Sequence, residues 1–278
     1  MRGATAVGFF ALASAAACSG TFLPLLPEAL DSGPVTDASG PSIVPSDSQV
    51  DASRQSYAEA VLADRPLLYL RLGGGSPGSA KSEIGATECK IVGAVESGKP
   101  GALSGESNAA FGFSNPRAFL NCGPTLDFPG RSPFTYEFWV LNSGLTLDHR
   151  HVFTKQGSTD PIVQKHNVYV RKGEGIVFER VVDDVEKKIA HLGDEVDVAK
   201  VFAYVAVTYD GRQLAMYVNG ELKRVLSDER EAKAKPDDFV IGASLRGHQF
   251  LGDLDEIAIY GKALSGDTIA RHFALAKR

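Results

Sequence analysis

The residues best placed to do chemistry are two aspartates two positions apart, Asp253 and Asp255, with Glu256 directly after them. Side chains alternate between the faces of a β-strand, so the two aspartates would share one face. Hydrolysis of a glycosidic bond needs a pair of facing carboxylates. The next position on that face is Ile257, and Glu256 would point to the opposite face. The spacing therefore favours carboxylates that bond nearby backbone or a basic partner and fix a strand end.

A second group is the histidine pair His149 and His151, preceded by Asp148. In a strand the two imidazoles would lie on one face, as metal ligands sometimes do. No third ligand is evident, and Arg150 between them opposes a cation. The oxygen donors that calcium could use are Asp127, Asp148, Asp160 and Asp255. No loop has the dense acid spacing that calcium prefers, so we predict no cofactor, with calcium as the open alternative.

The aromatic segment at residues 134–140 contains the only tryptophan of the chain. Strand alternation places Phe134, Tyr136, Phe138 and Val140 on one face, and Glu137 and Trp139 on the other. If the first face is core, Glu137 and Trp139 lie on the open side of the sheet. An aromatic ring beside a carboxylate would suit a sugar ring, so both are candidate ligand-binding residues. The alternative is that Trp139 packs against other parts of the fold.

Composition excludes several classes of function. The 278 residues include 29 Lys and Arg against 34 Asp and Glu, a formal charge of −5, which is not the basic footprint of a nucleic-acid-binding protein. No apolar run reaches the roughly 18–20 residues of a membrane-crossing helix. No serine lies in a nucleophile elbow, and no glycine loop has the context of a phosphate site. We therefore predict a protein that is not an enzyme and does not bind nucleic acid.

Residues 1–17 have the pattern of a secretory signal peptide, with Arg2 before an apolar stretch and small residues up to Ala17. Small residues directly before Cys18 resemble the bacterial lipoprotein signal. This resemblance implies that Cys18 is lipidated and becomes a stable membrane anchor. In the Gram-negative proteins of that resemblance, a residue other than Asp after the cysteine, here Ser19, implies the outer membrane, so we predict an outer-membrane or cell-surface protein. Ordinary secretory cleavage, giving a secreted or periplasmic protein, is the alternative.

The segment after Cys18 differs in composition from the rest of the chain. Residues 19–53 contain five prolines and no lysine or arginine, and all of their charges are acidic. Such a segment buries too little apolar surface to offset its ordering entropy, and its like charges extend it. We predict an unstructured acidic tether over residues 18–55 and a folded domain over residues 56–278.

Within that domain, the pattern is one of many short strands. Ser56 and Glu59 form a capping box before a helix at residues 57–63, and Ser265 caps a second helix at residues 266–276. Asp-Gly and Asn-Gly steps divide residues 201–226 into a three-strand antiparallel meander. Strands without long helices between them predict an all-β, two-sheet antiparallel jelly-roll sandwich with short flanking helices.

Several of these segments together resemble the laminin-G-like domain, a concanavalin A-like jelly roll. They are residues 60–72, 134–140, 202–211, 216–220 and 250–260. The resemblance implies a sheet face and end loops that can hold ligands. The superfamily also includes glucanases with three carboxylates on one strand face, and some members of the family bind calcium.

These observations predict an exported, surface-anchored module for binding or adhesion, with glycan as its ligand and no enzymatic activity. It would meet the membrane through the lipid anchor only. The alternative is a structural envelope protein whose partner is another extracellular protein. A glycan hydrolase of the concanavalin-like superfamily is the third possibility.

The two cysteines of the folded domain are Cys89 and Cys122. With Cys18 lipidated, they are the only thiols left in an exported domain, where disulfides persist. We predict a disulfide between them, with two free cysteines as the alternative.

Overall fold

The computed structural model describes residues 55–73, 78–115, 117–143, 149–156, 164–183, 188–194, 198–199, 201–234, 237–244 and 247–277. The chain divides into two units, Met1–Ser48 and Gln49–Arg278, and every described residue lies in the second. The predicted signal peptide, Cys18 and all of the predicted tether except Gln55 lie outside the described residues.

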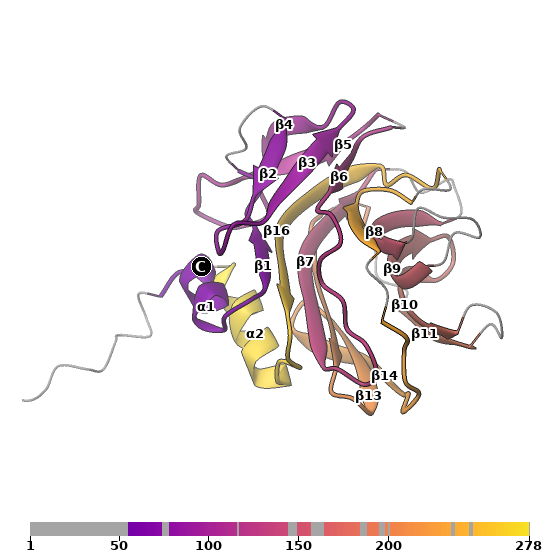
Figure 1. Cartoon of the computed structure of the whole chain (residues 1–278). Helices are drawn as coiled ribbons and strands as arrows, with labels where there is room; N and C mark the ends of the chain where they lie inside the picture. The colour runs from indigo at the N-terminus through magenta and orange to yellow at the C-terminus, as the bar shows by residue number, and fades with distance from the viewer. Residues whose placement is uncertain are drawn as a thin grey trace, which may run out of the picture. The chain divides into compact units, whose positions relative to one another are not determined.

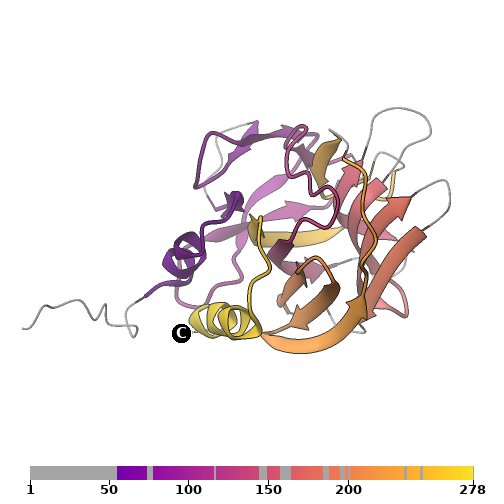
Figure 2. The same cartoon turned by 60° about the horizontal axis from the view of Figure 1, so that its bottom comes forward.

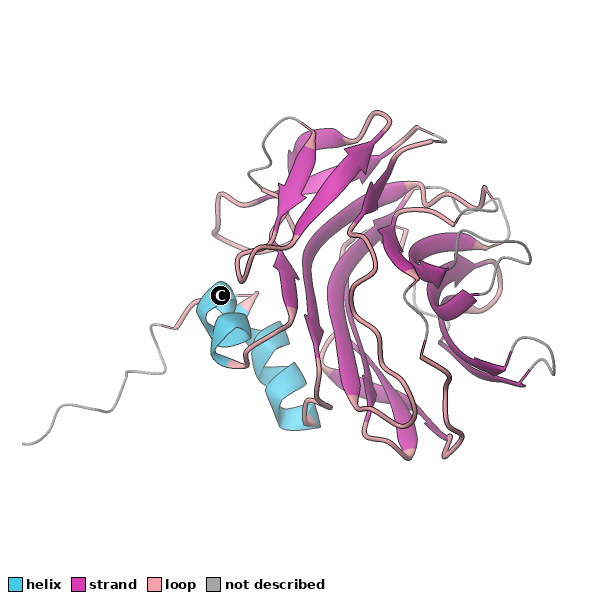
Figure 3. Cartoon of the chain, viewed as in Figure 1, coloured by secondary structure: helices cyan, strands magenta, loops and turns pink. Residues whose placement is uncertain are grey.

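The described residues form a helix at each end of the domain and strands between them (Figure 3). The helices are α1 (Tyr57–Ala63) and α2 (Gly266–Leu275). The strands are β1 (Leu68–Leu70), β2 (Ser79–Lys81), β3 (Glu88–Val92), β4 (Glu96–Pro100), β5 (Ala109–Phe113), β6 (Phe119–Asn121), β7 (Phe134–Asn142), β8 (Arg150–Gln156), β9 (Gln164–Arg171), β10 (Gly175–Asp183), β11 (Lys188–Asp194), β12 (Ala203–Tyr209), β13 (Gln213–Val218), β14 (Glu221–Ser227), β15 (Asp238–Ile241) and β16 (Gly252–Tyr260).

Among the described residues the strands form two sheets of eight (Figure 1). The first sheet has the order β14-β13-β12-β7-β16-β5-β4, and β1 pairs with the part of β16 beyond its β5 contact. The second sheet has the order β11-β10-β9-β8-β15-β6-β3-β2. Neighbouring strands in both sheets pair antiparallel. The structure confirms the predicted all-β, two-sheet antiparallel jelly-roll sandwich with short flanking helices.

The main core lies between the two sheets, where alternate side chains of facing strands meet. The β7 side chains that enter it are Phe134, Tyr136, Phe138 and Val140. Phe138 meets Phe153 of β8 edge to face, with ring centroids 4.7 Å apart. The alternation predicted for residues 134–140 is therefore confirmed.

A second apolar cluster lies on the outer face of the first sheet, beneath α1 and α2. The helices lie side by side there (Figure 2). α1 begins at the predicted capping box, in which Ser56 Oγ accepts the Glu59 N–H at 3.2 Å and the Glu59 carboxylate accepts the Ser56 N–H at 2.9 Å. Neither helix of the described residues is long and apolar enough to cross a bilayer.

The predicted meander is formed by β12, β13 and β14. Its second turn has φ of 51° at Asn219 and 80° at Gly220, the left-handed conformation that this residue pair favours. Gly211 in the first turn has φ of 95°. These turns are local in sequence, which is why the residues alone predicted them.

Candidate functional site

Glu137 and Trp139 lie on the outer face of the first sheet, as their alternation predicted, but that face is not open. Both side chains are 0% exposed because α1 and α2 cover them. The expectation that the sheet is open at these two residues is therefore wrong. The sequence predicted the two helices without indicating the surface on which they pack.

Trp139 is part of the packing under α2. Its ring stacks on Phe273 with centroids 5.9 Å apart, and the Tyr204 ring lies at 5.2 Å. The Lys277 Nζ lies 5.0 Å from the centre of the Trp139 ring, a cation–π distance. The packing alternative for Trp139 is confirmed.

Glu137 is the acceptor at the centre of a buried hydrogen-bond network. Tyr57 and Tyr260 donate hydroxyl protons to it at 2.7 and 3.1 Å, and His272 Nδ1 lies 3.0 Å away. The other nitrogen of His272 lies 3.1 Å from Asp64. Burial alone would lower the pKa of His272, but the Glu137 and Asp64 carboxylates outweigh it and raise that pKa. The network attaches α1 and α2 to β7, and the Glu137 side chain at its centre is fully buried.

The acidic strand at residues 253–256 departs from simple alternation. β16 shifts register against β7 between Asp255 and Ala258, and Glu256 has φ of 47°. This bulge turns both buried carboxylates toward Asn108, whose amide donates to Asp255 at 3.0 Å and to Glu256 at 2.6 Å. The expectation that Glu256 points away from Asp255 is therefore wrong, because the sequence carries no clear signal for a bulge.

The two carboxylates are engaged by their surroundings. Asp255 accepts the Ala102 N–H at 2.9 Å, and Glu256 accepts from Arg71 Nε at 3.0 Å and from the Tyr69 hydroxyl. Burial raises the pKa of Asp255 to about 7 and, with the Asp255 charge, that of Glu256 to about 8. This confirms the interpretation that they bond backbone and a basic partner. Adjacent acids at 0% exposure do not face each other across a substrate cleft.

The histidine pair gains a third member that the sequence did not indicate. His248, from the segment after β15, lies with its ring centroid 5.7 Å from His151 and 6.0 Å from His149. His151 Nδ1 is 3.0 Å from Thr154 Oγ1, and burial with the neighbouring histidines lowers the pKa of His151 to about 3. The described residues contain no group of three or more His, Cys, Asp or Glu that could hold a metal ion.

The oxygen donors considered for calcium are not brought together among the described residues. Asp148 and Asp160 lie outside them, and the oxygens of Asp255 already accept three hydrogen bonds, from Ala102, Glu256 and Asn108. Asp255 therefore does not fit a calcium site, which needs 6–8 free oxygen ligands.

Cys89 and Cys122 form the predicted disulfide. It ties β3 to the residue that follows β6, and both sulfurs belong to the core between the sheets. The same two strands pair directly, Val92 opposite Phe119. The disulfide therefore lies on the core side of the second sheet, and the opposite side of β3 and β6 forms part of the outer face of that sheet.

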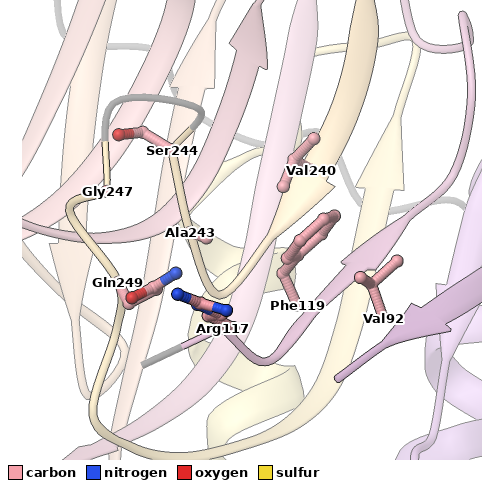
Figure 4. Close-up of a pocket in the computed structure, with 8 residues that line it drawn as sticks. All are labelled: Val92, Arg117, Phe119, Val240, Ala243, Ser244, Gly247 and Gln249. Atoms are coloured by element: carbon pink, nitrogen blue, oxygen red, sulfur yellow. The ribbon is translucent and has the colours of Figure 1, made fainter. Parts of the chain in front are cut away.

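That outer face carries a pocket of about 290 Å³, which we call the Phe119 pocket (Figure 4). Its lining residues are Val92, Arg117, Phe119, Val240, Ala243, Ser244, Gly247 and Gln249. Val92, Phe119 and Val240 come from β3, β6 and β15, which are neighbours in the second sheet, and they point away from the core. Sequence reasoning missed this pocket.

One side of the Phe119 pocket is set by the turn before β6. The Asn115 side chain accepts the Arg117 N–H at 3.1 Å. Gly93 has φ of 73° and lies so near the Arg117 carbonyl that a Cβ there would be 2.4 Å from the oxygen. A side chain at Gly93 would displace this turn, so the glycine allows the Arg117 backbone to take its position beside the pocket.

The other side is formed by Ala243, Ser244, Gly247 and Gln249, and two of these residues are hydrogen-bonded to β8. Thr154 Oγ1 donates to the Ala243 carbonyl at 3.2 Å, and Arg150 Nη1 donates to the Gln249 carbonyl at 2.9 Å. Ser244 contributes a buried hydroxyl that has no partner in the described part of the chain. Figure 4 shows the polar ends of Arg117 and Gln249 converging at one end of the pocket.

Chemically, the Phe119 pocket combines a half-buried aromatic ring with a guanidinium and an amide. Small-ligand sites have this character: apolar and aromatic walls with a few polar groups that fix orientation. None of the described residues that line it is a carboxylate. The arrangement can bind a ring that carries hydrogen-bond acceptors.

Solved structures share this fold. The binding domain of botulinum neurotoxin serotype G is 13% identical with a TM-score of 0.58, and the match covers 75% of this chain and 50% of that one. The binding domain of Paraclostridial Mosquitocidal Protein 1 is 16% identical with a TM-score of 0.59, and the match covers 76% of this chain and 52% of that one. The botulinum neurotoxin serotype D binding domain is 20% identical with a TM-score of 0.56, and the match covers 76% of this chain and 52% of that one. The chain spans about half the length of these structures, and at such identities the likeness shows the fold alone.

Sequence comparison gives the family. A search of curated proteins found no match. Residues 119–270, more than half of the chain, match the Laminin_G_3 model of the concanavalin A-like lectin/glucanases superfamily. The matched region runs from β6 into α2 and so includes strands of both sheets. The chain therefore belongs to the laminin-G-like family of the concanavalin A-like lectin/glucanases superfamily.

Proposed function

We propose that this protein is an exported, surface-anchored binding module without enzymatic activity, and that it recognises glycan in the Phe119 pocket. The observation that carries the proposal is the pocket itself, in which Arg117 and Gln249 converge beside the Phe119 ring. A sugar ring has an apolar face for the aromatic ring and hydroxyls for the polar groups. The first sheet offers no such surface among its described residues at Glu137 and Trp139, because the helices cover them.

The similar solved structures support a binding role in general terms. Their names describe binding domains, in some cases receptor binding domains. The buried, fully engaged state of Asp255 and Glu256 supports the absence of hydrolysis. Measurable hydrolysis of a β-glucan that is lost in Asp255→Asn would overturn the non-enzymatic part of the proposal.

The experiment for ligand recognition is a glycan array probed with the full-length protein, with and without calcium. Hits are then titrated against Phe119→Ala and the control Phe119→Leu, which keeps an apolar side chain but removes the ring. We expect Phe119→Ala to abolish binding and Phe119→Leu to weaken it, with both variants folded, because Phe119 lies outside the main core. Binding that both variants retain would place the ligand elsewhere.

Surface anchoring is proposed from the sequence at Cys18, which lies outside the described residues. Intact-mass analysis of membrane fractions should show acylation at this residue. The control Cys18→Ser should release the protein in soluble form with an unchanged domain. An unmodified wild-type protein starting at another residue would contradict the anchor.

One observation favours the alternative, a protein partner. Leu222 and Val225 of the edge strand β14 are 54% and 50% exposed and line a groove of about 270 Å³ with Tyr217 and Gly266. Exposed apolar groups that share a groove are typical of protein contacts. If the protein migrates as a complex on native gels, loss of that complex in Leu222→Glu, with glycan binding intact, would support this second function.

A further inference from the structure

The charge in the Phe119 pocket has one sign. Arg117 is the one charged side chain among the described residues that line it. Arg117 is exposed, and its guanidinium has no hydrogen bond or ion pair with a described residue. Elsewhere on the described surface, arginines such as Arg71 and Arg224 contact carboxylates, at 2.6 and 3.4 Å. The Arg117 guanidinium thus keeps its donors for a ligand.

A second arginine, Arg150, is hydrogen-bonded to the backbone of the pocket residue Gln249. Arg150 is 9% exposed, and its Nη1 donates to the backbone carbonyl of Gln249. Burial lowers the pKa of Arg150, and no carboxylate of the described residues pairs with it. An arginine keeps its proton throughout the ordinary pH range, so its charge adds to the positive potential there.

The donors suit an anionic group attached to a ring. A guanidinium presents a planar fork that matches two oxygens of a carboxylate or sulfate, and charge-assisted hydrogen bonds are the stronger kind. The Gln249 amide can add a further N–H donor. The volume of about 290 Å³ lies at the lower end of small-molecule sites and limits the occupant to a ring-sized unit.

Resting on the proposed glycan function, we propose that the bound sugar is acidic: its ring packs on Phe119, and its anionic group, carboxylate or sulfate, is held by Arg117 and Gln249. Arg117 is then the residue that determines specificity. A neutral sugar of the same shape would leave the guanidinium desolvated without a partner, which costs affinity.

The test uses matched ligands and the full-length protein in calorimetric titrations. One pair is an oligogalacturonate and its methyl ester, which differ in the charge of the carboxyl. The other is a sulfated galactan oligosaccharide and its desulfated form. We expect at least one acidic member to bind about tenfold or more tightly than its neutral counterpart. The pair whose acidic member binds more tightly shows whether the anionic group is a carboxylate or a sulfate.

The variants are Arg117→Gln, Arg117→Lys and the control Arg212→Gln. Arg212 is exposed at the turn between β12 and β13, so Arg212→Gln makes the same change in net charge away from the pocket. We expect Arg117→Gln to remove the preference for the acidic ligand, and Arg117→Lys to restore part of it, since a lysine keeps charge without the fork. Arg212→Gln should bind as the wild type does.

Three results would overturn the inference, and they can be told apart. If glycans bind and Phe119→Ala abolishes binding, but charged and neutral ligands bind equally and Arg117→Gln has no effect, the glycan function stands and the acidic specificity fails. If neither the array nor the ligand pairs show binding, the proposed glycan function itself fails. An equal loss in Arg117→Gln and Arg212→Gln would show a general charge effect and also refute the role of Arg117.

Discussion

His272 Nδ1 lies 3.0 Å from the Glu137 carboxylate, although 135 residues separate the two in the chain. Both side chains are fully buried, so their contact joins α2 to the middle of the first sheet. The contact raises the pKa of His272, which means that the folded state binds this proton more tightly than the unfolded chain.

The first prediction is the pH dependence that follows. The unfolded value is about 6.5, so the contribution of His272 to stability is fully present below about pH 6.5 and is lost as pH rises through the higher folded pKa. Melting temperatures from pH 5 to 9 should fall above pH 6.5 in the wild type. The difference between wild type and His272→Gln should shrink over that window. A difference that is constant with pH would contradict an ion pair.

The second prediction concerns Asn108, whose side-chain amide donates hydrogen bonds to both Asp255 and Glu256. Asn108→Ala removes hydrogen bonds to Asp255 and Glu256, and each loses a partner at a buried site. We expect a loss of about 2–3 kcal/mol in the free energy of unfolding, measured by urea denaturation. Asn121→Ala is the comparison variant: the Asn121 amide donates to one carboxylate, that of Asp238, and its oxygen accepts the Gly123 N–H. We expect Asn121→Ala to cost less, because only one carboxylate loses a donor.

The buried carboxylates of Asp255 and Glu256 predict a second dependence of stability on pH. The folded pKa values of about 7 and 8 lie above the ordinary values of these acids, so stability should fall as pH rises from about 4 to 8. Asp255→Asn should flatten this slope in urea denaturation at a series of pH values. An unchanged slope would contradict a raised pKa of Asp255.

The third prediction is that Trp139→Ala acts on stability and not on ligand recognition. Removing a fully buried aromatic side chain costs about 3–5 kcal/mol. Thermal melts should show this loss, and Trp139→Phe should lose less. Well below the melting temperature, glycan affinity should match the wild type because the Phe119 pocket lies on the other sheet. An unchanged melt with lost binding would return Trp139 to the binding site.

The fourth prediction concerns the disulfide, whose cysteines are 33 positions apart. On the chain-entropy account, its removal should lower the free energy of unfolding by about 3–4 kcal/mol. The double variant Cys89→Ala/Cys122→Ala, and wild type under reductant, should show the same shift in denaturation midpoint. A midpoint insensitive to reductant would contradict this contribution.

The sequence predicted the features that depend on neighbouring residues. The capping box at Ser56, the hairpin turns at Gly211 and Gly220, and the alternation through Phe138 each follow from a short local pattern. The disulfide followed from counting cysteines in an exported domain.

The remaining features depend on distant parts of the chain. The cover over Trp139 comes from a helix more than a hundred residues later, and no local pattern states where that helix packs. The Phe119 pocket needs β3, β6 and β15 to become neighbours, a result of the whole topology. The bulge at Glu256 reverses the direction that alternation predicts, and it is visible only in the folded chain, as a register shift against β7 and a positive φ.

The position of the helices gives the domain a front and a back. The described chain enters just before α1 and leaves just after α2, and both helices cover the outer side of the first sheet (Figure 1). The Phe119 pocket lies on the outer side of the second sheet. The start of the described chain at α1 and the Phe119 pocket with its Arg117 therefore lie on opposite outer faces of the sandwich, the back and the front.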